Sequence, residues 1–307
     1  TNLRIPSVQN KAYLTSLNAS ESSGGSLYLN NSQESTYKLL NCTSLTSIFV
    51  SGSGVSGFIP KFKGNNSLSS FSASPAFGLT GGRPDNGEHG YPDGATFVMY
   101  KDTFDDCRES ISSFTVRSTR LLYERDFEPG TFQNLPNLRT LYWYSYGRTG
   151  GDRDDVFVPN VSSCPRLESL NMPRNNFSGS APSMTSNDQI RYINLSRNKL
   201  TGAVPQYTNR TRLSYINMRN NNLQSFPGFE SLPSLRFLYL HNNSTLGGPI
   251  PDLTGPAPNL RRIYLYNCSF DSYTRGSFVG LSNIDRIIIS NNDLSESDLN
   301  NIITDLH

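Results

Sequence analysis

A short apolar pattern returns along this chain at intervals of roughly 22–25 residues, and it restricts the fold more than any other feature. In the copy that starts at residue 190, Ile193 and Leu195 alternate as in a strand, so their side chains point to the same side. Asn198 follows the strand, and Gly202 and Pro205 then interrupt any regular element. Each copy therefore predicts a short strand, a polar turn and an irregular return.

Six consecutive copies cover residues 167–294 and start at 167, 190, 213, 235, 260 and 284. Between residues 24 and 166 the copies are irregular, and insertions near 78–110 and 146–158 lengthen them. Residues 1–23 have no clear register and are interpreted as an N-terminal cap or linker. The regular copies predict a repeat architecture that runs through one elongated domain.

Stacking explains the residue types in each copy. A single turn cannot bury its own apolar side, so neighbouring turns share one core and pair their strands in parallel. A side-chain amide both donates and accepts hydrogen bonds, so a column of asparagines can satisfy backbone groups between turns. This asparagine ladder is predicted at Asn175, Asn198, Asn221, Asn243 and Asn292. Cys268 takes the same position in one copy, and a degenerate copy is expected around Phe97 and Met99.

The full spacing, L-x-x-L-x-L-x-x-N/C-x-L, resembles the leucine-rich repeat family. The tails NFSGSAP, KLTGAVP, TLGGPIP and GVSGFIP resemble the L-x-G-x-I-P extension of plant-type repeats, which also occur in secreted bacterial and bacteriophage adhesion and fibre proteins. The resemblance implies an α/β solenoid, in which a right-handed coil carries a parallel β-sheet on its concave face. The convex side is expected to be mostly irregular or 3-10 helical.

The last copy replaces the Gly-Pro tail with NNDLSESDLNNIITDL. Its apolar residues have helical spacing, so a capping helix is predicted over residues 295–307. Ser295 is the expected N-cap, with Asp298 as its capping-box partner. We expect this helix to close the end of a single leucine-rich repeat domain that covers residues 1–307.

Composition and cysteine spacing exclude several classes of protein. A formal net charge of +2 gives no reason to expect nucleic acid, and no apolar run is long enough to cross a membrane. Cys42 and Cys164 lie about five turns apart, so roughly 24 Å separates them, whereas a disulfide needs Cα atoms within about 7 Å. With Cys107 and Cys268, they are predicted to be buried thiols.

Motifs for catalysis or cofactor binding are absent from the sequence. His89, His241 and His307 lie far apart, and there is no zinc-protease, hydrolase or phosphate-loop motif. The Gly-rich segment 78–94 is interpreted as a loop. The acidic segment 151–155 offers calcium ligands, but it lacks a calcium-loop spacing and is interpreted as a solvated loop. We predict a non-enzymatic protein with no metal and no cofactor.

Sequons are numerous, which raises the question of glycosylation. The candidate glycosylation sites are Asn18, Asn30, Asn41, Asn65, Asn160, Asn176, Asn194, Asn209, Asn242, Asn243 and Asn267. The chain is rich in Asn, Ser and Thr, so ladder and turn asparagines that happen to precede Ser or Thr are the alternative explanation. A glycan on Asn194 would block the concave face.

Aromatic residues and arginines gather at the strand positions that should point away from the core. The candidate ligand-binding residues of the concave face are Tyr142, Tyr144, Tyr192, Tyr215, Arg219, Phe237, Tyr239, His241, Arg262, Tyr264 and Tyr266. Such residues give binding faces large rigid contact area and directional donors. The alternative is that tyrosine simply suits parallel strands. The crowding between 190 and 266 favours a ligand patch.

Three functions are compatible with these features. The first is an extracellular recognition or adhesion module that binds a protein or a cell-surface glycan on its concave face. The second is a structural subunit of an extracellular fibre or virion surface, which would self-associate. The third is a receptor-ectodomain or inhibitor-type leucine-rich repeat. All three place the chain outside the cell, at a cell surface or at a virion surface.

Overall fold

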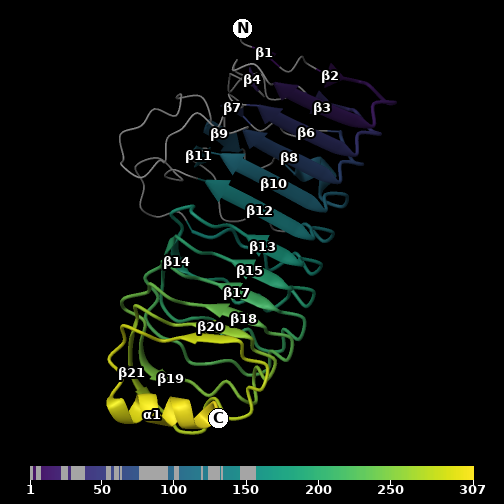
Figure 1. The fold of residues 1–307 in the computed structure, drawn as a ribbon. Helices are drawn as coiled ribbons and strands as arrows, with labels where there is room; N and C mark the ends of the chain where they lie inside the picture. The colour runs from purple at the N-terminus through teal and green to yellow at the C-terminus, as the bar shows by residue number, and fades with distance from the viewer. Residues whose placement is uncertain are drawn as a thin grey trace, which may run out of the picture. The chain divides into compact units, whose positions relative to one another are not determined.

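The computed structural model describes residues 3–4, 8–21, 27–28, 39–52, 57–58, 62, 64–75, 96–99, 104–118, 120–123, 132, 134–145 and 157–307. The chain divides into two compact units, Thr1–Arg153 and Asp154–His307. Each unit is a stack of turns, and the strands of successive turns pair in parallel (Figure 1). The predicted solenoid fold is confirmed.

The first unit contains twelve strands and a 3-10 helix among its described residues. They are β1 (Leu3–Arg4), β2 (Val8–Gln9), β3 (Ser16–Glu21), β4 (Leu27–Tyr28), β5 (Leu39–Leu40), β6 (Ser47–Gly52), β7 (Gly57–Phe58), β8 (Ser70–Pro75), β9 (Thr96–Met99), η1 (Asp105–Cys107), β10 (Ser113–Ser118), β11 (Arg120–Tyr123) and β12 (Thr140–Ser145). Five of these strands, β3, β6, β8, β10 and β12, follow one another in a parallel sheet that we call the front sheet of this unit.

The second unit has shorter strands and ends in a helix. Its elements are β13 (Ser169–Asn171), β14 (Ser178–Ser180), β15 (Tyr192–Asn194), β16 (Lys199–Thr201), β17 (Tyr215–Asn217), β18 (Phe237–Tyr239), β19 (Gly247–Ile250), β20 (Arg262–Tyr264), β21 (Ser269–Tyr273), β22 (Arg286–Ile288) and α1 (Glu296–Asp305). The front sheet of this unit consists of β13, β15, β17, β18, β20 and β22. Its register aligns the same repeat position in every turn, as Ile193 pairs with Ile216 and Ile216 with Leu238.

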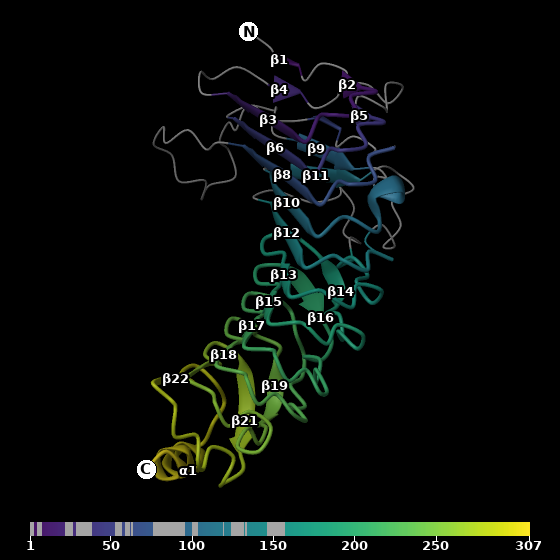
Figure 2. The ribbon, with the colours of Figure 1, turned by 90° about the vertical axis from the view of Figure 1, so that its right-hand side faces the viewer.

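The Gly-Pro tails of the repeats form small parallel sheets across the core from the front sheets (Figure 2). The tails NFSGSAP and KLTGAVP supply β14 and β16, and TLGGPIP supplies β19, which pairs with β21. In the first unit, GVSGFIP supplies β7, which pairs with β9. β9 itself belongs to this second sheet, between β7 and β11. The degenerate copy expected around Phe97 and Met99 is therefore not a turn of the front sheet.

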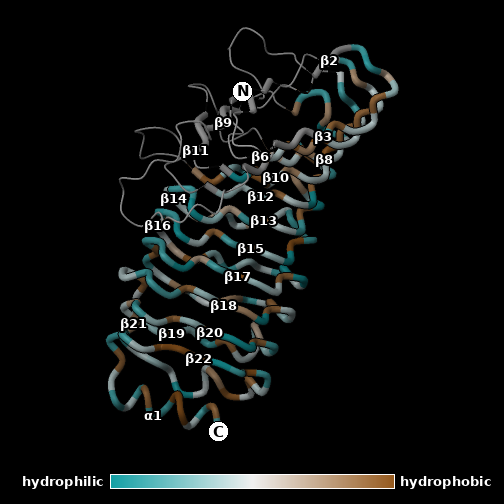
Figure 3. The backbone as a smooth tube through the Cα atoms, turned by 45° about the horizontal axis from the view of Figure 1, so that its top comes forward, coloured by the Kyte–Doolittle hydropathy of each residue, from teal (hydrophilic) through white to brown (hydrophobic). Residues whose placement is uncertain are grey.

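The core of each unit lies behind its front sheet, and apolar stretches recur from turn to turn (Figure 3). Along the strands of the second unit, the buried side chains are aliphatic, for example Leu170, Ile193 and Ile216. In the first unit, the buried strand positions include Phe71 and Phe114, which stack with ring centroids 5.4 Å apart. The period of two along each strand separates these core residues from the open face, the side of the front sheet that faces away from the core.

Side-chain amides connect successive turns of the second unit. The Asn198 Nδ2 donates to the carbonyls of Met172 and Leu195 at 3.0 and 2.9 Å, and its Oδ1 accepts from the backbone of Asn175 and Phe177. Further hydrogen bonds of this kind are made by Asn221, Asn243 and Asn292. Cys268 at the same position gives only long contacts from its Sγ, 3.6 and 3.7 Å. Amides therefore satisfy backbone groups that the turn would otherwise bury without partners.

The C-terminal helix α1 follows the last turn and begins at a capping box. The Asp298 backbone donates to the Ser295 side chain, and the Ser295 backbone donates to the Asp298 carboxylate. Ile302 is buried, but the other apolar residues of the helix are exposed: Leu299 by 41%, Ile303 by 56% and Leu306 by 41%. The helix was expected to close the end of the core, and of its four regularly spaced apolar residues only Ile302 is buried. Among the described residues, none of the helices has the length and apolarity to span a bilayer.

The N-terminal region contains a turn that the repeat pattern did not predict. β3 pairs with β6 in register, with Leu17 beside Ile48, so residues expected to be a cap or linker form the first strand of the front sheet. All four cysteines are buried thiols, as predicted. Burial raises the pKa of Cys107 to about 12 and that of Cys268 to about 11, so neither thiol is activated. The loop 78–94 and the acidic segment 151–155 lie outside the described residues.

Candidate ligand-binding surface

Six aromatic side chains gather on the open face of the front sheet in the second unit. This aromatic patch consists of Tyr192, Tyr215, Phe237, Tyr239, Tyr264 and Tyr266. All six are half-buried, whereas the residues that alternate with them, such as Ile193 and Leu238, are completely buried. The strand period of two therefore puts the rings outward, and the shared register brings rings from β15, β17, β18 and β20 side by side.

The rings of the patch contact one another continuously from turn to turn. Tyr192 and Tyr215 stack with centroids 4.4 Å apart and planes 9° apart. Tyr215 and Tyr239 meet edge to face at 5.6 Å, and Tyr239 and Tyr264 do so at 4.9 Å. These separations are those of favourable aromatic pairs. The stack covers one face of Tyr192 and one face of Tyr215, so ring edges and hydroxyl groups form much of the surface that the patch offers to a ligand.

Arg262 borders the patch and has a fixed position. Its Nε donates to the Asp285 carboxylate at 3.0 Å, and its guanidinium lies 5.9 Å from the centre of the Phe237 ring. Arg261 shares the same carboxylate at 3.6 Å. Burial, followed by the neighbouring Tyr215, raises the pKa of Tyr239 above its ordinary value, so its hydroxyl stays protonated. The prediction did not include Asp285, although it lies one repeat after Arg262.

His241 was predicted to be on the exposed surface, and that prediction is wrong. Its side chain is only 3% exposed, because the Tyr266 ring stacks on it with centroids 4.4 Å apart. Burial, followed by the nearby Arg219 cation, lowers the pKa of His241 to about 4. The imidazole is therefore neutral at pH 7. A ligand reaches it only past Arg219 and the tyrosines around it.

The remaining predicted contact residues lie in the first unit. Tyr142 and Tyr144 are half-buried on the open face of β12, and the Arg117 guanidinium lies 5.3 Å from the centre of the Tyr142 ring. They extend the list of outward aromatics, but the aromatic patch of the second unit is complete without them. In that patch, Asn217 is an additional polar neighbour, whose Nδ2 donates to the Tyr215 hydroxyl at 3.1 Å.

The structure separates the sequons by burial. Asn65 and Asn243 are completely buried, and Asn243 holds the backbone of its own and the preceding turn, so neither side chain has space for a glycan. The exposed sequons are Asn18, Asn41, Asn160, Asn209 and Asn267. Asn176, Asn194 and Asn242 are half-buried, and Asn30 lies outside the described residues. Asn194 donates to the Asn171 side chain at 3.0 Å on the open face, next to the aromatic patch.

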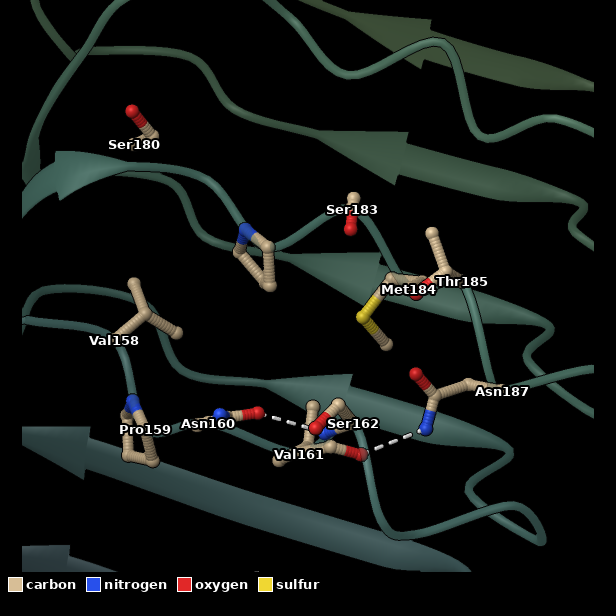
Figure 4. A pocket seen from close by; sticks show the side chains of 11 residues that line it. Val158, Pro159, Asn160, Val161, Ser162, Ser180, Ser183, Met184, Thr185 and Asn187 are labelled. Carbon is tan, nitrogen blue, oxygen red and sulfur yellow. Dashed lines mark hydrogen bonds between the residues drawn. The ribbon is translucent and has the colours of Figure 1, made fainter. Parts of the chain in front are cut away.

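A pocket of about 340 Å³ lies between two turns of the second unit, away from the aromatic patch (Figure 4). It is lined by residues 158–162 of one turn and by Ser180, Pro182, Ser183, Met184, Thr185 and Asn187 of the next. The Asn187 Nδ2 donates to the carbonyls of Val161 and Cys164 at 2.9 and 2.8 Å. This side chain therefore holds two turns together. The pocket has no charged side chain in its lining.

Catalytic and metal-binding clusters were not predicted, and the described part of the chain contains no group of three or more His, Cys, Asp or Glu residues that could hold a metal ion. In the second unit, Arg191 pairs with Glu168 and Arg210 with Asp188, while Arg261 and Arg262 share the carboxylate of Asp285. In this unit, the aromatic patch is consequently the feature with the composition of a binding surface.

Comparison with known proteins gives a family match and several structural matches. A family model described as leucine rich repeat matches residues 188–244. None of the curated proteins matches the sequence. Among solved structures, the ectodomain of the Arabidopsis thaliana receptor kinase GASSHO1/SCHENGEN3, in complex with CASPARIAN STRIP INTEGRITY FACTOR 2, superposes with a TM-score of 0.60. It is 20% identical, over 92% of this chain and 33% of that chain.

Two further structures show the same fold. PEPR1–AtPEP1 has a TM-score of 0.58 at 20% identity, over 85% of this chain and 37% of that chain. The Arabidopsis receptor kinase HAESA, in complex with the peptide hormone IDA and the co-receptor SERK1, has a TM-score of 0.55 at 17% identity, over 92% of this chain and 50% of that chain. The chain thus spans between a third and a half of these relatives. At such identities the similarity establishes the fold alone.

Proposed function

We propose that this chain, a leucine-rich repeat protein, is a non-enzymatic extracellular recognition module that binds a protein or peptide on the aromatic patch of its second unit. One observation carries the proposal: five aromatic side chains from four neighbouring strands, with Tyr266 just after the last of them, form a continuous set of ring contacts on the open face. Rigid aromatic groups flanked by arginine are the residues that dominate the energetics of protein interfaces.

The ring arrangement favours a polypeptide over a sugar as the ligand. Sugars stack on the free face of an aromatic ring, but here the Tyr192 and Tyr215 faces are turned toward each other. The Tyr266 face is likewise turned toward His241. The accessible groups are ring edges and hydroxyls, which suit the amides and apolar side chains of a peptide. The structural relative HAESA was solved with a peptide hormone, which supports the same class of ligand.

A peptide-display selection tests the proposal directly. The purified chain is panned against a random peptide library and, in parallel, applied to a glycan array. We expect peptides to be selected, and the double variant Tyr239→Ala/Tyr264→Ala to bind them at least about tenfold more weakly, as for loss of two central aromatics. Circular dichroism checks that the variant remains folded.

The matched control removes two exposed aromatics from the first unit, Tyr13→Ala/Phe49→Ala. Tyr13 is 97% and Phe49 42% exposed, so the control loses similar apolar area at a different place. We expect its affinity for the selected peptides to be unchanged. Selected peptides that bind both double variants equally well, or a chain that binds only glycans, would contradict the proposal.

A second candidate function, a structural subunit that self-associates, is favoured by the apolar residues of α1. Leu299, Ile303 and Leu306 are spaced i, i+4 and i+7, so they form one exposed apolar stripe. Two copies could bury this stripe against each other. Light scattering between micromolar and millimolar concentrations tests this, with Leu299→Ser/Ile303→Ser as the variant. A mass that stays monomeric at every concentration in both proteins excludes it.

A further inference from the structure

Beside the aromatic patch, a cation has no anionic partner. Arg219 follows β17 on the open face, and its guanidinium makes no ion pair with any described residue. The other arginine of the patch, Arg262, is neutralised by Asp285. Arg219 is half-buried, and its Nε is completely buried without a hydrogen-bond acceptor in the described part of the chain. Leaving such a donor unsatisfied costs free energy in the unliganded protein.

The neighbouring turn places a second unsatisfied atom next to this arginine. Asn217 pairs with Tyr239, and the Asn220 backbone donates to the His241 carbonyl at 3.0 Å, so Arg219 lies beside His241 in the column. The His241 Nδ1 is buried and likewise has no hydrogen-bond partner among the described residues. Two buried and unsatisfied polar atoms on neighbouring residues of adjacent turns indicate a site for a ligand group.

We propose that Arg219 and His241 form the anchoring subsite of the aromatic patch, and that this subsite takes the carboxylate of an acidic side chain on the protein ligand. The proposal rests on the proposed function above, because the ligand is the same. A carboxylate fits better than an amide because it neutralises the unpaired guanidinium and can accept from its Nε and Nη atoms together. The edges of Tyr239 and Tyr264 flank the subsite and partly exclude water, which strengthens the ion pair.

Carboxylate binding at this subsite should increase the proton affinity of His241. The groups that face the His241 imidazole are Arg219 from the preceding turn, Tyr239, and Tyr264 and Tyr266 from the following turn. Of these, only Arg219 is charged, and it disfavours the imidazolium. A bound carboxylate neutralises this charge and so raises the pKa of His241, which favours a protonated Nδ1 that donates to the ligand.

Two peptide libraries that differ only in one terminal group, a carboxylate or an amide, test the subsite. Both have five random residues on each side of a fixed centre, which is Glu in one library and Gln in the other. We expect the Glu library to yield the binders. Their affinity should fall by about tenfold or more in Arg219→Gln, because a partly buried carboxylate then loses its cation. Arg219→Lys keeps the charge and should retain part of the affinity, which also shows that the effect is not unfolding.

Arg212→Gln is the matched control. It removes the same charge, and Arg212 contacts Gln189 at 2.6 Å rather than the patch, so affinity should change less than about twofold. Equal enrichment from both libraries, or Glu binders that are indifferent to Arg219→Gln, overturns the carboxylate subsite but leaves the proposed function intact. If neither library yields a binder, the proposed function falls together with the subsite.

Discussion

The two front sheets differ in what fills their inward strand positions: aromatic rings contribute to the core in the first unit but not in the second. In the first unit, Phe71, Phe114 and Trp143 point inward from β8, β10 and β12 and are completely buried. In the second unit, the inward residues of the front-sheet strands are Leu and Ile, and the rings point outward instead. The chain therefore uses similar side chains as core filling in one unit and as exposed surface in the other.

The open faces of the two front sheets also differ, because short hydroxyl side chains dominate in the first unit and aromatic side chains in the second. The open face of the first unit has six-residue strands and mostly short hydroxyl side chains, namely Ser47, Ser51, Ser70, Ser72, Ser113, Thr115 and Thr140. Its outward aromatics are Phe49, Tyr142 and Tyr144. Hydroxyl side chains of this length give little contact area to a partner. The inward or outward position of a ring along its strand, and not the number of aromatic residues, thus distinguishes a ring that stabilises the fold from a ring that can bind a ligand.

The largest effect is expected from an inward ring of the first unit. Phe114→Ala removes a completely buried ring that contacts Phe71, Phe104 and Phe132 at 5.1–5.5 Å. The resulting cavity should lower the free energy of unfolding by about 3–5 kcal/mol. Urea denaturation followed by circular dichroism measures the change. A loss below about 1 kcal/mol would show that the first-unit core is not closely packed around this ring.

A smaller loss is expected from the amide ladder of the second unit. Asn198→Ala leaves two buried carbonyls and two backbone N–H groups without their side-chain partner, and should cost about 2–4 kcal/mol. The matched control is Asn292→Ala in the last turn, where the side chain is half-buried and water can replace it. Its loss, measured by the same denaturation, should be clearly smaller. Equal losses would mean that the ladder does not depend on burial.

Between residues 167 and 294, the sequence was sufficient to predict the fold because every physical requirement has its own residue type. Aliphatic residues fill the interior, and an amide satisfies the backbone after each strand, as at Asn221. The alternation also predicts correctly which residues of β18 and β20 point outward. The strand β3 was missed because only Leu14 and Leu17 mark its turn, which is too short a pattern to recognise without the paired β6.

Burial of His241 could not be predicted from the period of two. An outward side chain is normally exposed, but Tyr266 from the next turn stacks over this one. Such covering depends on the rotamers and size of neighbours, which repeat spacing does not specify. The same holds for the exposed apolar residues of α1, because helical spacing predicts a stripe and not what it contacts.

The buried imidazole makes the stability of the second unit depend on pH. The pKa of His241 is about 4 in the folded chain, below its ordinary 6.5, so the unfolded chain binds the proton more tightly. The contribution is complete above pH 6.5 and is lost as the pH falls toward 4. Relative to His241→Gln, wild type should lose about 1–3 kcal/mol between pH 7 and 4.5 in urea denaturation. A difference between the two proteins that stays constant with pH would contradict a buried neutral histidine.

The smallest change in stability is expected where the effect on binding is largest. Tyr239 and Tyr264 are half-buried and lie outside the core, so each change to alanine should alter the free energy of unfolding by about 1 kcal/mol or less. Set beside Phe114→Ala, this measurement separates a ring retained for contact with a partner from a ring retained for packing. Should Tyr264→Ala destabilise the chain as strongly as Phe114→Ala, the outward rings would be structural, and the contrast between the two units would disappear.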